Sequence, residues 1–124
     1  MDLTPALLAS LNVTRRQFEV RCASIVAMCQ ADDCLVLLAC IRLYDKQTAD
    51  EQRMDVTVHD NDMGFQFMDA KFGSKMARLL KAGETIYTHN MPRLRRMAYK
   101  YRRQLTIMSF LKDRAKVEAV AKAA

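Results

Sequence analysis

The sequence predicts an all-α fold, a compact bundle of five to six helices that ends in a basic amphipathic helix. Only three Gly and two Pro interrupt the 124 residues, whereas an all-β domain needs a turn signal about every ten residues. Strong helix formers such as Ala, Leu, Arg, Lys and Met dominate, and the hydrophobic fraction of 51% argues against disorder. We expect one domain over residues 1–124, with residues 112–124 as a frayed C-terminal tail.

Two helices are predicted at the N-terminus, each opened by a threonine. Thr4 is a capping residue followed by Pro5 in the first helical position, and this helix extends to about Leu11. Asn12 then breaks it, and Thr14 caps the second helix. The apolar residues of the second helix are three or four residues apart, at Phe18, Cys22, Ile25, Val26 and Cys29.

The third predicted helix is the most apolar part of the chain. Asp32 or Asp33 caps it, and it runs to about Lys46 with apolar residues on most of its sides, which is typical of a central core helix. Thr48, followed by two acidic residues, predicts a cap for a weak fourth helix that ends before Val58.

Residues 58–68 predict an irregular loop held by its aromatic side chains. The turn formers of this stretch are Asp60, Asn61, Asp62 and Gly64. Phe65, Phe67 and Met68 are too apolar for a solvated loop, so we expect them to anchor it in the core.

A fifth helix is predicted over 69–82, with Gly83 as its C-terminal stop. Gly73 lies inside this range and costs a helix about 1 kcal/mol relative to Ala. That cost indicates either close packing at Gly73 or a helix that starts one turn later, at Ser74.

The last helix is predicted to begin near Thr88 or Asn90 and to continue to Leu111, with Pro92 tolerated in its first turn. Its buried stripe follows steps of three and four residues, at Leu94, Met97, Ala98, Tyr101, Leu105 and Met108.

Positive charge is concentrated in this C-terminal part. Residues 1–90 carry ten Lys and Arg against twelve Asp and Glu, whereas residues 91–124 carry ten against two. No acidic residue lies between Met91 and Leu111. The candidate binding residues are Arg93, Arg95, Arg96, Lys100, Arg102, Arg103 and the interleaved Tyr99. Arginine pairs with phosphate through a planar fork and stacks on bases, so this surface is suited to nucleic acid.

Two other interpretations of the basic helix stay open. It could be a solvated face that pairs with acids elsewhere in the fold, such as Asp55, Asp60 or Asp62. Helices 69–82 and 88–111 could also form a helix-turn-helix, but the N-terminal end of the second helix is not its charged part, and such motifs read bases with that end.

No feature of the sequence indicates catalysis, a cofactor or a metal. His59 and His89 lie in separate loop-like contexts, and the sequence around His59 is an ordinary polar turn. The four cysteines lack metal-ligand spacing, so we expect all of them to be reduced and buried: Cys22, Cys29, Cys34 and Cys40. The most apolar run, residues 34–41, is too short to span a membrane. These features predict a soluble, cytoplasmic, non-enzymatic protein.

From Gln47 to Leu105 the sequence resembles a family of small proteins encoded by phages and mobile elements, some of which form the tails of phage-type helicases. The resemblance rests on QTADEQ at residues 47–52, Gly64-Phe65-Gln66, Asp69, Phe72-Gly73, Met76-Ala77, Arg95-Arg96-Met97 and the closing KYRRQL at residues 100–105. Gln66 stands where the family usually has Asn, and Thr88 where it often has Pro. The resemblance implies a phage or mobile-element source, hence a bacterial host cytoplasm, and a role near DNA transactions.

The sequence therefore predicts an accessory module that binds nucleic acid, DNA or RNA, through its basic C-terminal helix. The alternative is a counter-defence inhibitor or adaptor that binds an acidic surface of a host protein or nucleoprotein complex. A purely structural phage component would bind neither. The oligomeric state stays open.

Overall fold

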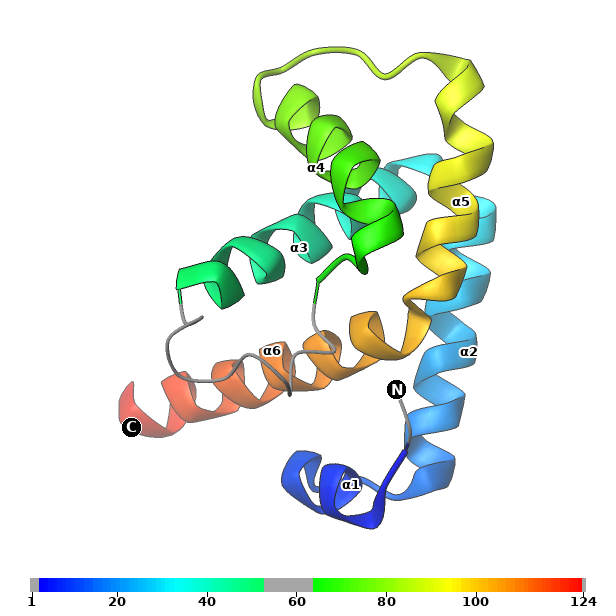
Figure 1. Cartoon of the computed structure of the whole chain (residues 1–124). Helices are drawn as coiled ribbons and strands as arrows, with labels where there is room; N and C mark the ends of the chain where they lie inside the picture. Colours follow the sequence, from blue (N-terminus) through cyan, green and yellow to red (C-terminus); the bar gives the residue numbers. More distant parts are fainter. Residues whose placement is uncertain (1–2, 53–63, 124) are drawn as a thin grey trace.

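The computed structural model describes residues 3–52 and 64–123, and every regular element within them is a helix (Figure 1). The elements are α1 (Pro5–Leu11), α2 (Arg15–Ala31), α3 (Asp33–Gln52), α4 (Phe67–Lys81), the short 3₁₀ helix η1 (Thr88–Asn90), α5 (Met91–Lys100) and α6 (Arg102–Ala123). The predicted all-α fold is confirmed. None of the helices in the described ranges combines the length and the apolar composition that crossing a membrane requires.

The two N-terminal helices begin at the predicted residues, and α1 ends at Leu11 as predicted. The Thr4 hydroxyl accepts a hydrogen bond from the Leu7 amide at 3.1 Å, and Thr14 accepts one from Gln17 at the same distance. The Gln17 side chain accepts the Thr14 amide in return at 2.8 Å, which completes a capping box. Asn12 ends α1 in the left-handed conformation, with a φ of 56°.

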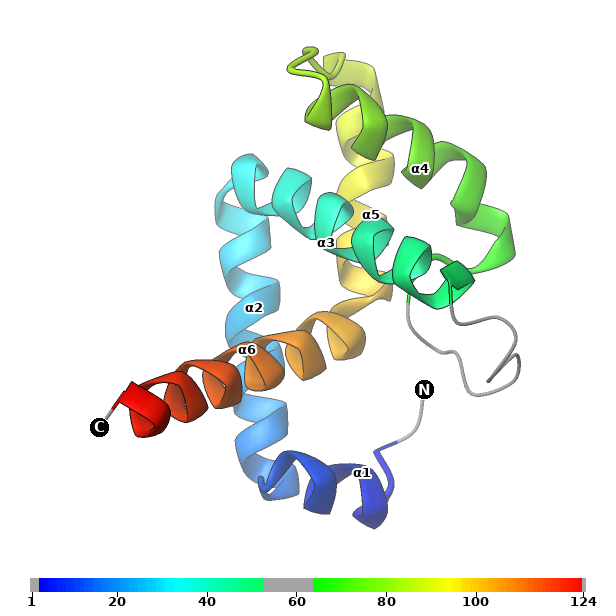
Figure 2. The ribbon, with the colours of Figure 1, turned by 90° about the vertical axis from the view of Figure 1, so that its left-hand side faces the viewer.

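Helix α3 is the centre of the bundle and packs on α2, α4, α5 and α6 (Figure 2). It is longer than predicted, because it continues through Gln52. The separate helix predicted from Thr48 is therefore wrong. No Gly or Pro lies between Asp33 and Gln52, so nothing in this stretch forces the helix to end. Residues 53–58, where that helix was predicted to end, lie outside the described ranges.

Two groups of buried side chains hold the helices together. The larger one surrounds α3 and comprises Val36, Ala39, Cys40, Leu43, Phe65, Met76, Ala77, Met91, Leu94, Met97, Ala98, Tyr101 and Leu105. The smaller one comprises Leu3 before α1, Phe18 of α2 and Ile107 of α6, and Leu7, Leu8 and Leu11 of α1 pack against it. Both α5 and the beginning of α6 thus bury the apolar stripe that the sequence predicted.

The two phenylalanines before α4 have different environments. Phe65 is buried in the larger core as predicted, but Phe67 is 97% exposed and Met68 is 80% exposed. Helix α4 begins two residues earlier than predicted, and Phe67 and Met68 occupy its first turn. The face of α4 that contacts the core starts only at Asp69, so these two side chains point elsewhere. Gly83 follows α4 with a φ of 79°, as expected for a helix stop.

The four cysteines are free, but they are not all buried. Cys40 lies in the core, and burial raises the pKa of its thiol to about 11. Cys22 and Cys29 are partly buried, whereas Cys34 is exposed in the first turn of α3. The predicted burial is therefore wrong for Cys34, because helical periodicity places a residue on a face but does not show which turns a neighbouring helix covers.

Candidate functional site

Helix α5 divides its residues between the core and solvent. Met91, Leu94, Met97 and Ala98 are buried. Pro92 lies in the first turn, where its missing N–H costs no helical hydrogen bond. The remaining positions leave five of the seven predicted binding residues exposed: Arg93, Arg95, Arg96, Tyr99 and Lys100.

The chain turns sharply at Tyr101, so the single helix predicted from residue 88 to 111 is wrong (Figure 1). Tyr101 has a φ of −96° and a ψ of 17°, which end α5. The turn allows α5 to pack on α3 while α6 crosses α2 and buries Ile107 beside Phe18. Arg102 and Arg103 therefore lie on α6, are partly buried and do not continue the line of cations on α5.

Asp69 of α4 is bound by the residues at this turn. The Tyr101 hydroxyl donates to an Asp69 carboxylate oxygen at 2.6 Å, and Lys100 Nζ donates to the same oxygen at 2.7 Å. The Gln66 amide donates to the Tyr101 hydroxyl oxygen at 2.8 Å. Burial would raise the pKa of Asp69, but the hydrogen bonds from Lys100 and Tyr101 outweigh it and lower that pKa. Burial, together with the hydrogen bond to Asp69, raises the pKa of Tyr101.

Gly64 and Phe65 are fixed on the same turn. The Gln104 side chain accepts the Gly64 amide at 2.7 Å and donates to its carbonyl at 3.3 Å. The Phe65 ring lies edge-on to Tyr101, with centroids 6.0 Å apart, and covers Gly73 so closely that a Cβ there would lie 2.5 Å from the ring. Gly73 is thus a site of close packing, the first of the two alternatives that the sequence left open.

The pattern that carries the family resemblance is therefore largely structural. Gly64-Phe65-Gln66 and Asp69 bind residues 100–105, which include Lys100, Tyr101 and Gln104. These contacts assign a structural role to these residues. The side chains of residues 47–52 lie outside the description.

Two of the predicted binding residues face α4. The Lys100 ammonium is held by Asp69, as described above. The Arg93 guanidinium lies over the Phe72 ring, 4.2 Å from its centroid. Lys100 therefore forms an ion pair within the protein. Arg93 packs on the face of the Phe72 ring and remains exposed.

Arg95 pairs with the first residue of α3. Its Nε and Nη2 donate to the two carboxylate oxygens of Asp33 at 3.0 and 2.8 Å. The side-chain hydrogen bonds from Arg95 lower the pKa of Asp33. The interpretation that acids elsewhere neutralise the basic helix thus holds for Arg95 and Lys100, but through Asp33 and Asp69. The acids suggested by the sequence, Asp55, Asp60 and Asp62, lie outside the described residues.

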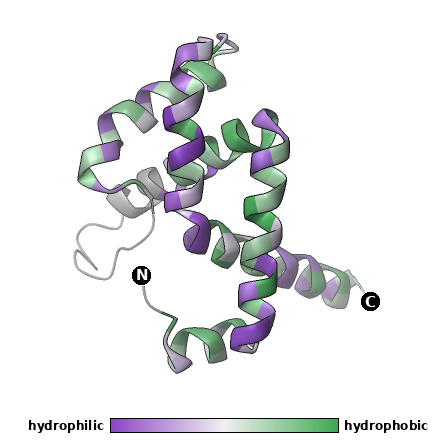
Figure 3. Cartoon of the chain, turned by 90° about the vertical axis from the view of Figure 1, so that its right-hand side faces the viewer, coloured by the Kyte–Doolittle hydropathy of each residue, from purple (hydrophilic) through white to green (hydrophobic). Residues whose placement is uncertain are grey.

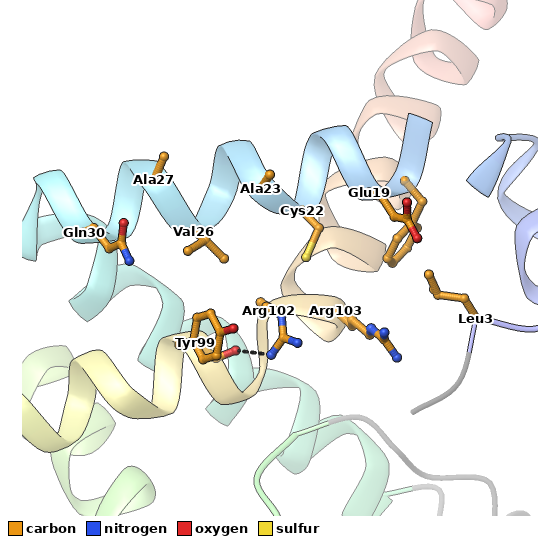
Figure 4. A pocket seen from close by; sticks show the side chains of 11 residues that line it. Leu3, Glu19, Cys22, Ala23, Val26, Ala27, Gln30, Tyr99, Arg102 and Arg103 are labelled. Atoms are coloured by element: carbon orange, nitrogen blue, oxygen red, sulfur yellow. Dashed lines mark hydrogen bonds between the residues drawn. The ribbon is translucent and has the colours of Figure 1, made fainter. Parts of the chain in front are cut away.

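The other predicted residues gather where α5 meets α6. Arg96 is exposed and forms no ion pair with any residue of the described ranges. The Arg102 guanidinium stacks on the Tyr99 ring at 4.4 Å and donates to the Tyr99 carbonyl at 3.2 Å (Figure 4). Tyr99 is 54% exposed. Arg103, partly buried, lies beside them at the start of α6 (Figure 4).

These residues form one wall of a groove whose other wall is α2. The groove consists of two adjoining hollows of about 370 and 510 Å³, which share Val26, Gln30 and Tyr99. Figure 3 shows the hydrophobic middle of α2 beside the more hydrophilic ribbon of α5. We call this the α2–α5 groove and define its cationic wall as Arg95, Arg96, Tyr99, Arg102 and Arg103.

The α2 wall was not predicted from the sequence, which gave Ile25, Val26 and Cys29 only as apolar positions of the second helix. All three are only partly buried, and Val26 points from α2 toward the groove (Figure 4). One signal was present in the sequence. Val20 and Met28 make α2 apolar beyond one face, and both are more than half exposed.

The histidines were considered as candidate site residues, and His89 lies within the described residues. His89 is exposed and stacks on Tyr87, with ring centroids 5.7 Å apart. His59 lies outside the described residues. Within those residues, no group of three or more His, Cys, Asp or Glu side chains is placed to hold a metal ion.

Helices α4 and α5 pack chiefly on α3, which does not support a helix-turn-helix. Comparison of the chain with protein-family models, with curated proteins and with solved structures finds no match. What the groove can bind is therefore inferred from its own residues and contacts.

Proposed function

We propose that the protein is a non-enzymatic accessory module of a phage or mobile element that binds nucleic acid through the cationic wall of the α2–α5 groove. The source is suggested only by the sequence resemblance. The binding function is supported by one observation above all: Arg96, Arg102 and Arg103 stand together around an exposed tyrosine, in a stretch without acidic residues.

The pattern of ion pairs narrows the set of residues that would contact phosphate. Lys100 is held by Asp69 and Arg95 by Asp33, so both cations are partly neutralised before any ligand arrives. Arg96 has no such partner among the described acids. A polyanion would therefore meet Arg96 first, and recruiting Arg95 would require it to compete with Asp33.

The test is a titration of binding against salt. Each cation that contacts phosphate displaces condensed counterions, so log affinity falls with log salt by about 0.7 to 0.9 per contact. We expect Arg96→Gln combined with Arg103→Gln to flatten the slope by roughly two contacts. Fluorescence anisotropy with labelled single-stranded DNA, duplex DNA and RNA gives the slope directly.

The control is Lys75→Gln combined with Arg78→Gln. These residues are exposed on α4, outside the groove, and their replacement removes the same net charge. The control should leave the slope nearly unchanged. Equal effects of the two double variants would show that only the net charge matters, and no binding of any nucleic acid at low salt would overturn the proposal.

The second candidate function, a counter-defence inhibitor or adaptor, is favoured by a different surface. Phe67 and Met68 are adjacent, almost fully exposed and at the start of α4. Exposed apolar side chains of this size often mark protein contacts, and they contribute nothing to the binding of phosphate. A pull-down from host lysate with and without nuclease tests this function. Capture of a defined protein that survives nuclease and is lost in Phe67→Ser would favour it.

A further inference from the structure

We propose that the α2–α5 groove admits unpaired bases, so that the nucleic acid bound there is single-stranded. This inference rests on the proposed function and adds to it the class of ligand. It starts from the contrast between the two walls, one aromatic and cationic, the other apolar.

The stacking surface is the pair formed by Tyr99 and Arg102. The guanidinium and the ring are already stacked, which keeps both planar groups in a fixed orientation at the groove (Figure 4). Bases stack on tyrosine rings and on arginine planes alike. In a duplex both faces of each base are covered by its neighbours, so only an unpaired base can use this surface.

The opposite wall suits the flat, largely apolar faces of bases. Val26 and Cys22 of α2 point toward Tyr99 and Arg102 across the groove, and Gln30 lies on the same side (Figure 4). The amide of Gln30 can donate and accept hydrogen bonds at a base edge. A phosphate by itself would gain nothing from these side chains.

The charge of the groove favours a polyanion over an acidic helix of a protein. Among the residues that the structure describes, four arginines and one acid, Glu19, line it. An amphipathic helix would need a continuous apolar strip on both walls, but on the α5 side the lining is mainly Tyr99 and arginines. In a nucleic-acid strand phosphates alternate with bases, so the phosphates can pair with the arginines while a base stacks on the adjacent aromatic ring.

The experiment uses the full chain and three labelled probes of equal length, about 12 nucleotides, within the range that one small domain covers. They are an oligothymidylate, an abasic strand with the same phosphates, and a duplex. We expect the oligothymidylate to bind about tenfold more tightly than the abasic strand, as stacking of one base allows. Tyr99→Ala should remove that difference, and Tyr99→Phe should keep it.

Tyr87→Ala is the matched control, since Tyr87 is an exposed tyrosine outside the groove. It should leave the ratio between thymidylate and abasic strand unchanged. Equal binding of all three probes, with the salt dependence described above, would overturn the base-binding inference and leave the proposed function standing. Binding of none of the three probes at low salt would overturn both.

Discussion

Asp69 connects α4 to the turn between α5 and α6. It is 8% exposed and receives hydrogen bonds from Tyr101 and Lys100 on one oxygen. A carboxylate in such a place is stabilised only while both donors remain. If one donor is removed, the charged carboxylate stays buried with fewer hydrogen bonds, and the free energy of unfolding decreases.

The pH dependence of stability should therefore include Asp69. Its pKa in the folded protein is lowered, so it contributes free energy of unfolding above its unfolded pKa of about 3.9, and that contribution is lost as the pH falls through the folded pKa. We expect Asp69→Asn to lower stability at neutral pH and to flatten the loss below about pH 4. Urea denaturation from pH 7 downward measures both effects.

Asp45→Asn is the control for this prediction, because Asp45 forms an exposed ion pair with Lys81. Exposed pairs contribute about 0–1 kcal/mol, so its acid profile should follow the wild type. Tyr101→Phe should cost about 1–3 kcal/mol, because the buried Asp69 loses a donor. An unchanged acid profile in Asp69→Asn would show that other carboxylates govern acid unfolding.

At the scale of elements, the turn at Tyr101 and the close contact at Gly73 determine how the C-terminal helices pack. Phe65 fits between them because residue 73 has no side chain. The same ring meets Tyr101 edge-on. A substitution at Gly73 should therefore disturb the packing at the start of α6 as well as that of α4.

We expect Gly73→Ala to destabilise the protein although Ala is the better helix former. The added Cβ would lie 2.5 Å from the Phe65 ring, and displacing that ring costs about 1–3 kcal/mol, against a propensity gain of about 1 kcal/mol. In a Phe65→Leu background the same substitution should cost much less. A double-mutant cycle by urea denaturation measures the coupling, and additive effects would contradict the packing argument.

The helices that could be predicted from the sequence are those whose signals are local. Thr4, Thr14 and Gly83 are followed or preceded by the residues that their caps require, and the structure has those caps. The break at Tyr101 has no such signal. Met97, Tyr101 and Leu105 keep a spacing of four across it, and no Gly or Pro marks it.

The candidate site was predicted in part for the same reason. The cations of α5 form a local charge pattern, so the sequence shows them directly. Their partners do not follow from the sequence, because Asp33 and Asp69 reach Arg95 and Lys100 only through the packing of α3 and α4. The apolar wall of the groove likewise depends on where α2 packs relative to α5. The spacing of apolar residues within α2 does not show that position.

On the scale of the whole molecule, stability should be unevenly distributed. The larger core surrounds α3, whereas every residue of α6 from Leu111 to Ala123 is exposed. The end of α6 has a few surface contacts, such as Arg21 with Asp113 at 2.9 Å. Such contacts contribute little, so this helical segment has almost nothing that opposes local unfolding.

Hydrogen exchange of backbone amides should show this gradient. We expect amides near Val36–Leu43 to exchange only on global unfolding, and amides of residues 112–123 to exchange with little protection. Mass spectrometry of peptides after deuterium labelling resolves the two regions. Strong protection of residues 112–123 would contradict the predicted frayed tail and point to a partner, such as a second copy, that covers it.

The central position of α3 has a further consequence for dividing the chain into two pieces. A cut between Gln52 and Gly64 separates α1–α3 from α4–α6, yet the larger core draws on both pieces, with Val36 and Leu43 from one and Leu94 and Leu105 from the other. Neither fragment buries its apolar residues without its partner, and Asp69, Lys100 and Tyr101 stay together in the second. Separately expressed halves should therefore regain the fold by assembling, which makes this point of the chain suited to a split reporter.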